Sequence, residues 1–365
     1  MRFSPATCAA LAGLAYLGVA VACLRRFGAR RAEHGTATPS VSILKPLRGA
    51  EEGLYENLVS FCEQAYPDFR LYLSVRDPGD PAAQVARSVV ARFGDRCELA
   101  VGAAATDAPN PKIANLSAVA ARARGEIVVI ADADMRVGPD YLRAIVAPFE
   151  RREVGLVTCL YRGRPAGGLA SQLGAMFINE QFAPSVLVAG ALEPLRYGFG
   201  ATLAVRRETL DAIGGLNALG AHIADDHRLG QLTSERGWKV VLARYVVENV
   251  VAERNLASLW ARELRWSRTI RSVRPWGHAF SFVTFGLPLA LLAAAPARDR
   301  SARGFLVGSA LALRFALRRE AGRALGAAPA GSPMLVPLRD ALSLATWVAS
   351  FFGRRVRWRG ETLEL

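Results

Sequence analysis

Two aspartates separated by one residue follow a short aliphatic run near the middle of the chain. The run at residues 127–130 is Ile-Val-Val-Ile, and Asp132 and Asp134 come just after it. This composition is typical of a buried strand in an α/β sheet, and ligands of such sheets collect where the strands end. Asp132 and Asp134 could therefore bind Mg²⁺ or Mn²⁺, which complete their coordination with phosphate oxygens and water. The alternative is that the two carboxylates only cap the turn after the strand.

Further carboxylates stand at the ends of other predicted elements. Asp77 follows a predicted strand at residues 69–75, and the Pro-Gly pair after it is equally typical of a turn that the aspartate organises. Asp225 and Asp226 open a predicted helix, where capping and the macrodipole favour acids in any case. A transferase that deprotonates an alcohol also needs a carboxylate within hydrogen-bond reach of the attacking oxygen. Asp226 is therefore our candidate for the general base, and the capping role stays open.

Basic and aromatic side chains share one face of a predicted helix at residues 256–272. Arg262, Arg265 and Trp266 are spaced i, i+3 and i+4, which places them together. Two arginines could hold a diphosphate by charge-assisted hydrogen bonds, with Trp266 as a flat apolar wall. An amphipathic helix lying on anionic lipid would show the same pattern. The two roles are compatible, because this helix leads directly into an apolar segment.

Strands and helices alternate along the chain and would position these side chains. Such alternation with short turns predicts a mostly parallel, doubly wound α/β sheet. No glycine-rich phosphate loop of the usual patterns occurs between a strand and a helix, so phosphate would be bound through metal and basic side chains. The predicted strands lie at 41–47, 69–75, near 99, at 127–130, at 154–160 and after the glycines at 198–200, and the predicted helices at 54–64, 82–93, 112–123, 140–151, 170–182, 208–213 and 225–237.

Composition and charge narrow the class of protein. Of the 365 residues 52% are hydrophobic, which indicates membrane segments attached to a folded domain. The formal net charge of +14 suits an anionic partner, such as a membrane surface or a phosphorylated substrate. We expect no nucleic acid, because the arginines are dispersed instead of lying in flexible tails with interleaved aromatics. The five scattered cysteines indicate neither zinc nor disulfides, and fit reduced thiols in a cytosolic domain.

Apolar runs near both ends predict a multi-pass membrane protein. Residues 6–24 are long enough to cross a bilayer and arginines follow at once, whereas a cleaved signal peptide would have its charges before a shorter run. Crossings are also predicted at 276–297 and 335–352, with 304–317 interfacial or re-entrant. The positive-inside rule places the intervening domain and the arginines at 354–359 in the cytoplasm.

These runs divide the chain into three predicted parts. Residues 1–38 are an N-terminal transmembrane anchor and linker, 39–272 a cytoplasmic domain, and 273–365 a C-terminal membrane region. Arg339 and Asp340 interrupt the last apolar run. They are either a paired feature at the interface or part of a polar opening through which a lipid headgroup enters.

Six short motifs, in order over residues 41–271, give the chain a resemblance to a known family. It resembles the ceramide glucosyltransferase family, which is glycosyltransferase family 21, with bacterial hopanoid-associated relatives. The resemblance implies a GT-A nucleotide-sugar transferase domain, Rossmann-like with a mostly parallel sheet, between N- and C-terminal transmembrane helices. The motifs are KPLRG at 45–49, YP at 66–67 with VRDPGDPA at 75–82, NPKIANL at 110–116, DAD at 132–134, ADDH at 224–227 and RELRW at 262–266.

The resemblance also implies roles for the acidic and basic residues. Asp77 resembles the family's aspartate that contacts the uridine of a UDP-sugar, and Lys112 resembles the basic residue near that nucleotide. Asp132 and Asp134 occupy the motif that binds the metal and the diphosphate. Asp226 matches the aspartate regarded as the catalytic base.

The remaining motif and two departures concern the diphosphate and the acceptor. Arg262, Arg265 and Trp266 match the family motif that holds the diphosphate and the acceptor region. The Asp-Ala-Asp at 132–134 is closer to the general family-2 pattern than to the Asp-Ser-Gly of animal ceramide enzymes. His227 stands where those enzymes carry an aromatic residue.

The function that the resemblance implies is a UDP-sugar-dependent lipid hexosyltransferase at the cytoplasmic face of a bacterial inner membrane. It would move glucose or N-acetylglucosamine from the UDP-sugar to a hydroxyl of a ceramide or hopanoid type of lipid, with inversion and with Mg²⁺ or Mn²⁺ as cofactor. A diacylglycerol acceptor is equally open. Two rivals remain: a processive polysaccharide synthase, which usually carries more membrane helices, and a non-catalytic basic protein that binds the anionic membrane surface.

Overall fold

The computed structural model describes residues 4–31, 33, 35–102, 108–297, 299–353, 355–358 and 361–364. Two of the C-terminal arginines, Arg354 and Arg359, lie outside the described residues. The chain forms two compact units. The first comprises Met1–Arg30, Arg162–Glu193 and Val251–Leu365, and the second comprises Arg31–Tyr161 and Pro194–Val250. The predicted division at residues 38 and 272 stays a prediction.

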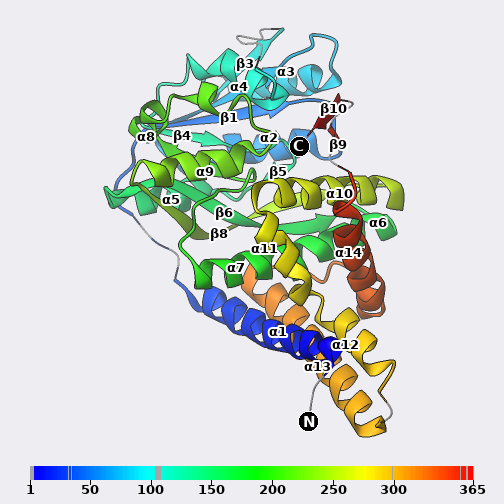
Figure 1. Ribbon diagram of the computed structural model, residues 1–365. Helices are drawn as coiled ribbons and strands as arrows, with labels where there is room; N and C mark the ends of the chain where they lie inside the picture. The colour runs from blue at the N-terminus through cyan, green and yellow to red at the C-terminus, as the bar shows by residue number, and fades with distance from the viewer. Residues whose placement is uncertain are drawn as a thin grey trace. The chain divides into compact units, whose positions relative to one another are not determined.

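The second unit is built on a mixed sheet with strand order β3-β2-β1-β4-β7-β6-β8-β5 (Figure 1). Strands β3, β2, β1 and β4 pair parallel, as the alternation of elements predicted. Strand β7 pairs antiparallel with β4 and β6, and β5 pairs antiparallel with β8. The strands are β1 (Val41–Leu47), β2 (Phe69–Val75), β3 (Cys97–Val101), β4 (Ile127–Ile130), β5 (Met135–Arg136), β6 (Val154–Pro165), β7 (Leu203–Arg206) and β8 (Lys239–Val251).

Side-chain and proline caps begin α3 and α4, two of the helices that cover this sheet. Asp80 and Asn110 accept hydrogen bonds from backbone N–H groups in the first turns of α3 and α4, and each of these helices has proline at its start. Both helices follow a strand of the parallel half and return the chain to its other end. The helices of this unit are α2 (Leu54–Cys62), α3 (Pro81–Phe93), α4 (Pro111–Ala120), α5 (Tyr141–Val146), α8 (Arg207–Ala212) and α9 (Asp225–Glu235).

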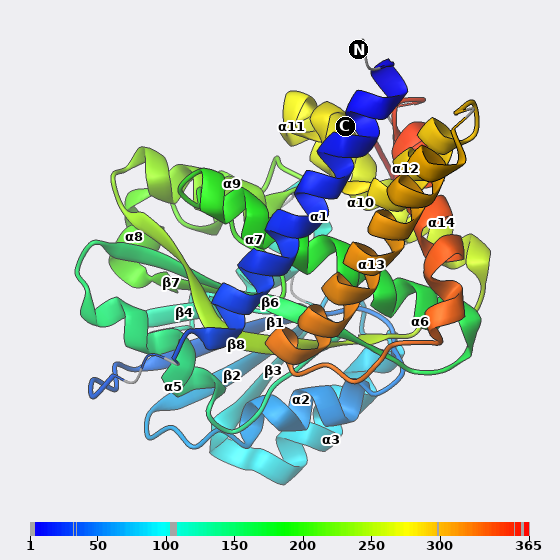
Figure 2. The same ribbon diagram turned by 90° about the horizontal axis from the view of Figure 1, so that it is seen from below.

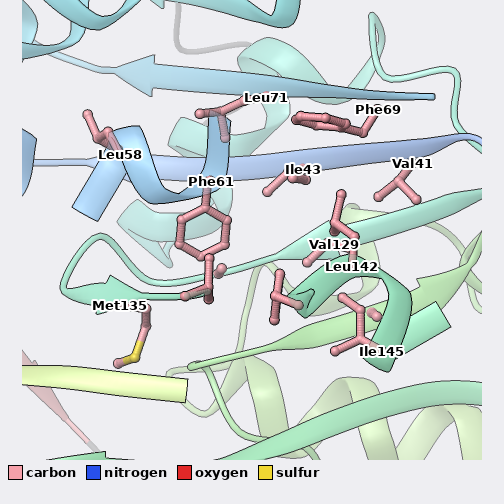
Figure 3. Close-up of a cluster of buried hydrophobic side chains, with 14 of the residues drawn as sticks. Val41, Ile43, Leu58, Phe61, Phe69, Leu71, Val129, Met135, Leu142 and Ile145 are labelled. Carbon is pink, nitrogen blue, oxygen red and sulfur yellow. The ribbon is translucent and has the colours of Figure 1, made fainter. Parts of the chain in front are cut away.

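The sheet separates two apolar cores, and strand β1 contributes to both. Ile43 packs into the core under α2, α3 and α5, and the next residue, Leu44, packs into the core on the opposite face. A strand buried on both faces is apolar on both, which is why β1 shows no alternation of polar and apolar residues, although it also buries Ser42 and Lys45. Figure 3 shows the first core, where Phe61 and Leu58 of α2 meet Leu71 of β2.

The first unit is helical, and its longest elements are α1 and α13. The stretch Gly168–Leu192 is one continuous helix whose middle, Ile178–Phe182, is a π-helical turn. The helices are α1 (Pro5–Ala29), α6 (Gly168–Phe177), α7 (Ala183–Leu192), α10 (Leu256–Val273), α11 (Pro275–Phe280), α12 (Gly286–Ala294), α13 (Arg300–Leu325) and α14 (Val336–Ser350), and a hairpin of β9 (Arg355–Trp358) and β10 (Glu361–Glu364) follows them.

Two helices in the described part of the chain are long and apolar enough to cross a membrane, α1 and Gly168–Leu192. The pair Pro275–Thr284 and Gly286–Ala294, bent by 64°, could count as a third. The crossing predicted at 6–24 thus corresponds to α1, and that at 276–297 to the bent pair. The structure differs at 335–352, where α14 has 15 residues and at about 22 Å is shorter than a hydrocarbon core of about 30 Å.

Candidate active site

Asp132 lies where β4 ends and is held by contacts to three other segments. Its backbone N–H donates to the carbonyl oxygen of Gly200 at 3.1 Å, and its own carbonyl oxygen accepts from Lys45 Nζ at 2.7 Å. Its Oδ1 lies 2.9 Å from Lys112 Nζ. The side chain of Asp132 is nevertheless 38% exposed, so it can receive a ligand from solvent.

Lys112 connects this strand end to the start of α9. It lies in the first turn of α4, which Asn110 caps, and its Nζ lies 3.0 Å from Oδ2 of Asp225 as well as contacting Asp132. Burial alone would lower the pKa of Lys112, but the carboxylates of Asp132, Asp225 and Asp226 outweigh burial and raise it above the usual range. Lys112 is therefore a fixed positive charge among three carboxylates.

Asp226 is positioned by backbone N–H groups. Gly200 N–H donates to its Oδ2 at 3.2 Å, and His227 N–H donates to its Oδ1 at 2.7 Å. Burial and the neighbouring Asp225 carboxylate raise the pKa of Asp226 to about 6, against the opposite effect of Lys112. A carboxylate with a pKa near the working pH is a stronger base than an ordinary aspartate and is still ionised at neutral pH.

Gly200 joins Asp132 to Asp226 through its backbone alone. It accepts from the N–H of Asp132 and donates to the carboxylate of Asp226. A Cβ at this position would lie 2.5 Å from Oδ2 of Asp132, closer than real Cβ atoms approach. Gly198 also donates its N–H to the carbonyl oxygen of Asp226, at 3.3 Å. The glycines before β7 thus provide both the hydrogen bonds and the space that bring the two aspartates together.

Asp134 lies beside Asp132 and contacts β8. Its Oδ2 accepts from Asn249 Nδ2 at 2.8 Å. Burial and the Asp132 carboxylate raise the pKa of Asp134, while the Asn249 amide acts in the opposite direction. The described residues contain no group of three or more metal-ligating side chains. The two carboxylates nevertheless fit Mg²⁺ or Mn²⁺, because these ions need few protein ligands and would offset the negative charge that raises this pKa.

Asp77 lies at the same edge of the sheet but makes only a local contact. Its Oδ1 accepts from the N–H of Gly79 at 2.9 Å, as expected of an aspartate that organises a turn. Strand β2, which Asp77 follows, is separated from β4 by β1, so the two strand ends are about 10 Å apart. The role of Asp77 in binding uridine stays a prediction.

The predicted basic face of α10 belongs to the first unit. The Arg262 guanidinium lies over the Trp266 ring, 4.9 Å from its centroid, and Arg262 Nη1 lies 2.5 Å from Glu253 Oε1. Its Nε and Nη2 are buried and have no hydrogen-bond partner in the described part of the chain, and a Cβ on Gly174 would lie 2.5 Å from Nη2, so the protein itself covers this nitrogen. The Trp266 ring stacks on Phe177 at 6.0 Å. Arg262, Arg265 and Trp266 thus share one helix, and their contact with the aspartates stays a prediction.

Sequence reasoning gave no role to Lys45 and did not single out Asn249. Lys45 is fully buried, with Nζ 3.7 Å from the centroid of the Phe61 ring, and burial lowers its pKa to about 7. The available signal was a lysine inside an otherwise apolar strand. Asn249 lies on β8, which was not predicted, so no sequence signal linked it to Asp134.

His227 forms a stacked pair beside the candidate base. Its ring lies 5.9 Å from the ring of Tyr197, and the two planes differ by 6°. The imidazole ring of His227 therefore stacks on Tyr197 at the position where the family's animal enzymes carry an aromatic residue.

Comparison with known proteins agrees with the motifs. Residues 6–365 match the family model described as glycosyl transferase family 21. The chain belongs to glycosyltransferase family 21. Ceramide glucosyltransferase 1 of Caenorhabditis elegans is 24% identical over 246 residues, which are 67% of this chain and 53% of that protein. Beta-monoglucosyldiacylglycerol synthase of Trichormus variabilis is 25% identical over 259 residues, 70% of this chain and 53% of that protein.

This family 21 chain therefore spans about half the length of the curated relatives it matches. Among solved structures, it resembles a mannosyltransferase from Pyrobaculum calidifontis in complex with GDP-Man and Mn²⁺, with a TM-score of 0.57 and 18% identity over 95% of this chain and 98% of that one. The likeness shows the GT-A fold that the motifs predicted.

Proposed function

We propose that this family 21 chain transfers a hexose from a UDP-sugar to a hydroxyl group of a membrane lipid, with inversion. The observation that carries the proposal is the link through Gly200, which joins a carboxylate of raised pKa, Asp226, to a solvent-exposed carboxylate that fits a metal, Asp132. A base beside a diphosphate site is the arrangement that a nucleotide-sugar transferase requires.

Asp226 acts as the general base in this proposal. It accepts the proton of the lipid hydroxyl while the hydroxyl oxygen attacks the anomeric carbon. The new C–O bond forms on the face opposite the breaking bond to the diphosphate, so one displacement inverts the configuration. UDP leaves with the electron pair of that bond.

Asp132 and Asp134 would hold the divalent cation, with Asn249 and Lys112 orienting them. When bound, Mg²⁺ or Mn²⁺ supplies Lewis-acid stabilisation of the charge on the leaving diphosphate. Lys112 adds a positive charge that is fixed before the reaction begins. Arg262 and Arg265 are proposed to bind the same diphosphate, and Asp77 the uridine.

The names of the relatives support a lipid acceptor and glucose as the sugar. We propose glucose or N-acetylglucosamine as the sugar and a ceramide, hopanoid or diacylglycerol as the acceptor. We further propose that residues 39–272 face the cytoplasm of a bacterial inner membrane, with 1–38 as the anchor and 273–365 as a membrane region. The net charge of +14 would hold that domain against anionic headgroups.

Turnover with defined donors tests the proposal. Purified protein is incubated with several UDP-sugars and a lipid extract of the host, with Mn²⁺ present or removed by chelation, and the products are identified by mass spectrometry. We expect one glycolipid carrying a single hexose, whose formation stops on chelation. A long polymer would instead identify a processive synthase, and failure to bind UDP in the presence of Mn²⁺ would leave a non-catalytic membrane protein.

The variant Asp226→Asn tests the assigned base. It should abolish transfer and keep UDP binding, measured by calorimetry with Mn²⁺, because the amide cannot accept the proton. Asp211→Asn is the matched control, since Asp211 is an exposed aspartate on α8. Normal turnover by Asp226→Asn would remove it as the base.

A further inference from the structure

Helices α1 and α13 of the first unit run side by side in the same direction (Figure 2). Near their C-terminal ends, Arg25 Nη2 lies 3.3 Å from Glu320 Oε1. A Cβ on Gly28 would lie 3.4 Å from the Cα of Ala324. Near the other end, Ala10 shares an apolar cluster with Leu306. These pairs have nearly the same separation in sequence, so the two helices are parallel and their C-terminal ends lie at one level.

Arginines concentrate at that level on both helices. Arg25, Arg26 and Arg30 end α1, and α13 carries Arg318, Arg319 and Arg323 in its last turns. Because α1 is long and apolar enough to cross a bilayer, its basic end marks the level of the cytoplasmic headgroups. The last turns of α13 therefore lie where anionic lipid is available.

A pocket of about 440 Å³ opens beside these turns of α13. This volume is in the range of sites that hold small ligands, which run from about 300 to about 1,000 Å³. One wall is basic, and Phe315, 41% exposed, lies one turn closer to the apolar part of the helix. Besides Phe315, the lining includes Asn179, Glu180, Arg318, Arg319 and Arg323, and the segment 327–330 forms the far side.

Part of the charge at the pocket wall is neutralised by ion pairs. Arg314 donates to Glu180 Oε2 at 2.8 Å and to Asp340 Oδ1 at 3.0 Å. Arg318 donates to the other oxygen of Glu180, Oε1, at 2.7 Å. Arg314 and Arg318 thus form an ion-pair network with the carboxylates of Glu180 and Asp340 next to the pocket.

The arginines at the mouth of the pocket keep an excess of positive charge. Arg319 has no hydrogen-bond or ion-pair partner among the residues that the structure describes. Arg323 lies 3.4 Å from Glu320 Oε1, and the same oxygen also faces Arg25. The Glu320 carboxylate is therefore shared by Arg25 and Arg323, and Arg319 has no carboxylate partner in the described part of the chain.

We propose that this pocket binds the phosphate of an anionic phospholipid from the surrounding bilayer. Arg319 and Arg323 would contact the phosphate by charge-assisted hydrogen bonds. Phe315, which shares a helix face with Arg318 and Arg319, would contact the beginning of an acyl chain. The proposal rests on the membrane placement of α1 and not on sugar transfer, so binding can be measured without a sugar donor.

Lipid binding by the full chain in detergent tests this site. Native mass spectrometry compares the affinity for phosphatidylglycerol with that for phosphatidylcholine in the original protein and in Arg319→Gln/Arg323→Gln. We expect the preference for phosphatidylglycerol to fall by about thirty-fold in the double variant, as for the loss of two hydrogen bonds of ordinary net strength at an exposed site. Arg26→Gln/Arg30→Gln is the matched control, because it removes the same charge at the same level outside the pocket.

Three outcomes would overturn the proposal. The preference could survive in Arg319→Gln/Arg323→Gln while thermal melting shows that the variant is folded. It could fall equally in both double variants, which would show diffuse attraction to the basic end of the helices. Inorganic phosphate could displace phosphatidylglycerol at constant ionic strength, which would assign the pocket to free phosphate. Loss in the pocket variant alone, without displacement by phosphate, would support the site.

Discussion

Gly200 is the residue through which the candidate base and the candidate metal ligand are positioned together. Its backbone contacts both aspartates, and the carboxylate nearest to it also pairs with Lys112, so that carboxylate cannot move aside freely. A single methyl group at this position therefore acts on the geometry of the whole cluster. Sites of this kind lose rate steeply with small displacements, by about a hundredfold for about 1 Å.

We accordingly predict that Gly200→Ala lowers the rate of transfer by about a hundredfold, because its Cβ would displace Asp132. Turnover and thermal melting are measured together. Gly190→Ala is the control, since a Cβ there meets nothing within 4 Å. Full activity in Gly200→Ala would show that the Asp132 carboxylate can shift without consequence.

The raised pKa of Asp226 predicts opposite effects on activity and on stability. The base works only when ionised, so the rate should fall as the pH drops through about 6. For stability, a folded pKa above the unfolded value of about 3.9 means that the folded state binds more protons between those values. This contribution is complete below pH ~4 and is lost as the pH rises through the folded pKa.

The effect of Asp226→Asn on the free energy of unfolding should therefore be more favourable at neutral pH than at pH ~4 by about 2–3 kcal/mol, while the variant abolishes transfer. The effect should become less favourable toward pH ~4, where the original carboxyl is protonated in the folded state. Chemical unfolding at several pH values measures it, with Asp211→Asn as the exposed control. A difference in stability between Asp226→Asn and the original protein that does not change with pH would contradict the raised pKa.

Within the first unit, a buried ion pair connects α10 to α14. Arg339 donates from Nη1 and Nη2 to the two carboxylate oxygens of Glu263, each at 2.7 Å. The Arg339 guanidinium also lies over the Phe177 ring, 5.5 Å from its centroid, and Phe177 stacks on Trp266. The pair therefore sits behind the face of α10 that carries the family motif.

We predict that Glu263→Leu and Arg339→Met each destabilise the protein by about 3–5 kcal/mol, because each leaves a buried charged group without its partner. The double variant Glu263→Leu/Arg339→Met should lose much less than the sum. Unfolding midpoints of the four proteins in detergent form the double-mutant cycle. Additive losses would show that the two side chains do not depend on each other.

The bounds of the strands show how much of the fold could be predicted from the sequence. Strands β1, β2 and β4 have the predicted bounds, because each is an unbroken run of mostly apolar residues that the sheet buries on both faces. Strand β8 was not predicted, since its burial varies along 13 residues without a period of two. The aspartates were found from their places at element ends. The contacts of Lys112 with Asp225 and of Asn249 with Asp134 join residues that are far apart in sequence. Only the fold shows these contacts.

The length of an apolar run in the sequence did not by itself identify the helices that are able to cross a membrane. Gly168–Leu192 is long and apolar enough to cross, but the sequence pattern predicts only a helix at 170–182 there. Helix α13 has 26 residues where a shorter interfacial segment was expected. Helix α13 packs on α1 through Ala10 and Leu306 and pairs with it through Arg25 and Glu320, and hydropathy does not measure either contact.

The parallel arrangement of α1 and α13 predicts which positions share one side of the membrane. In a background where Cys8 and Cys23 are replaced by serine and the three buried cysteines are kept, one further cysteine is placed at Ser4 or Arg30, the two caps of α1. By the positive-inside rule, Ser4→Cys should react with a membrane-impermeant maleimide in right-side-out vesicles, and Arg30→Cys only after the vesicles are opened.

The second pair of positions tests α13 in the same way. Ser301 lies near the start of α13 and Ala328 follows its end, and both are exposed. Because the two helices run in the same direction, Ser301→Cys should react like Ser4→Cys, and Ala328→Cys like Arg30→Cys. Transfer activity of each variant shows that it is folded. If Ser301→Cys and Ala328→Cys both react only after opening, α13 lies on the cytoplasmic side without crossing, and the basic ends of the two helices no longer define one headgroup level.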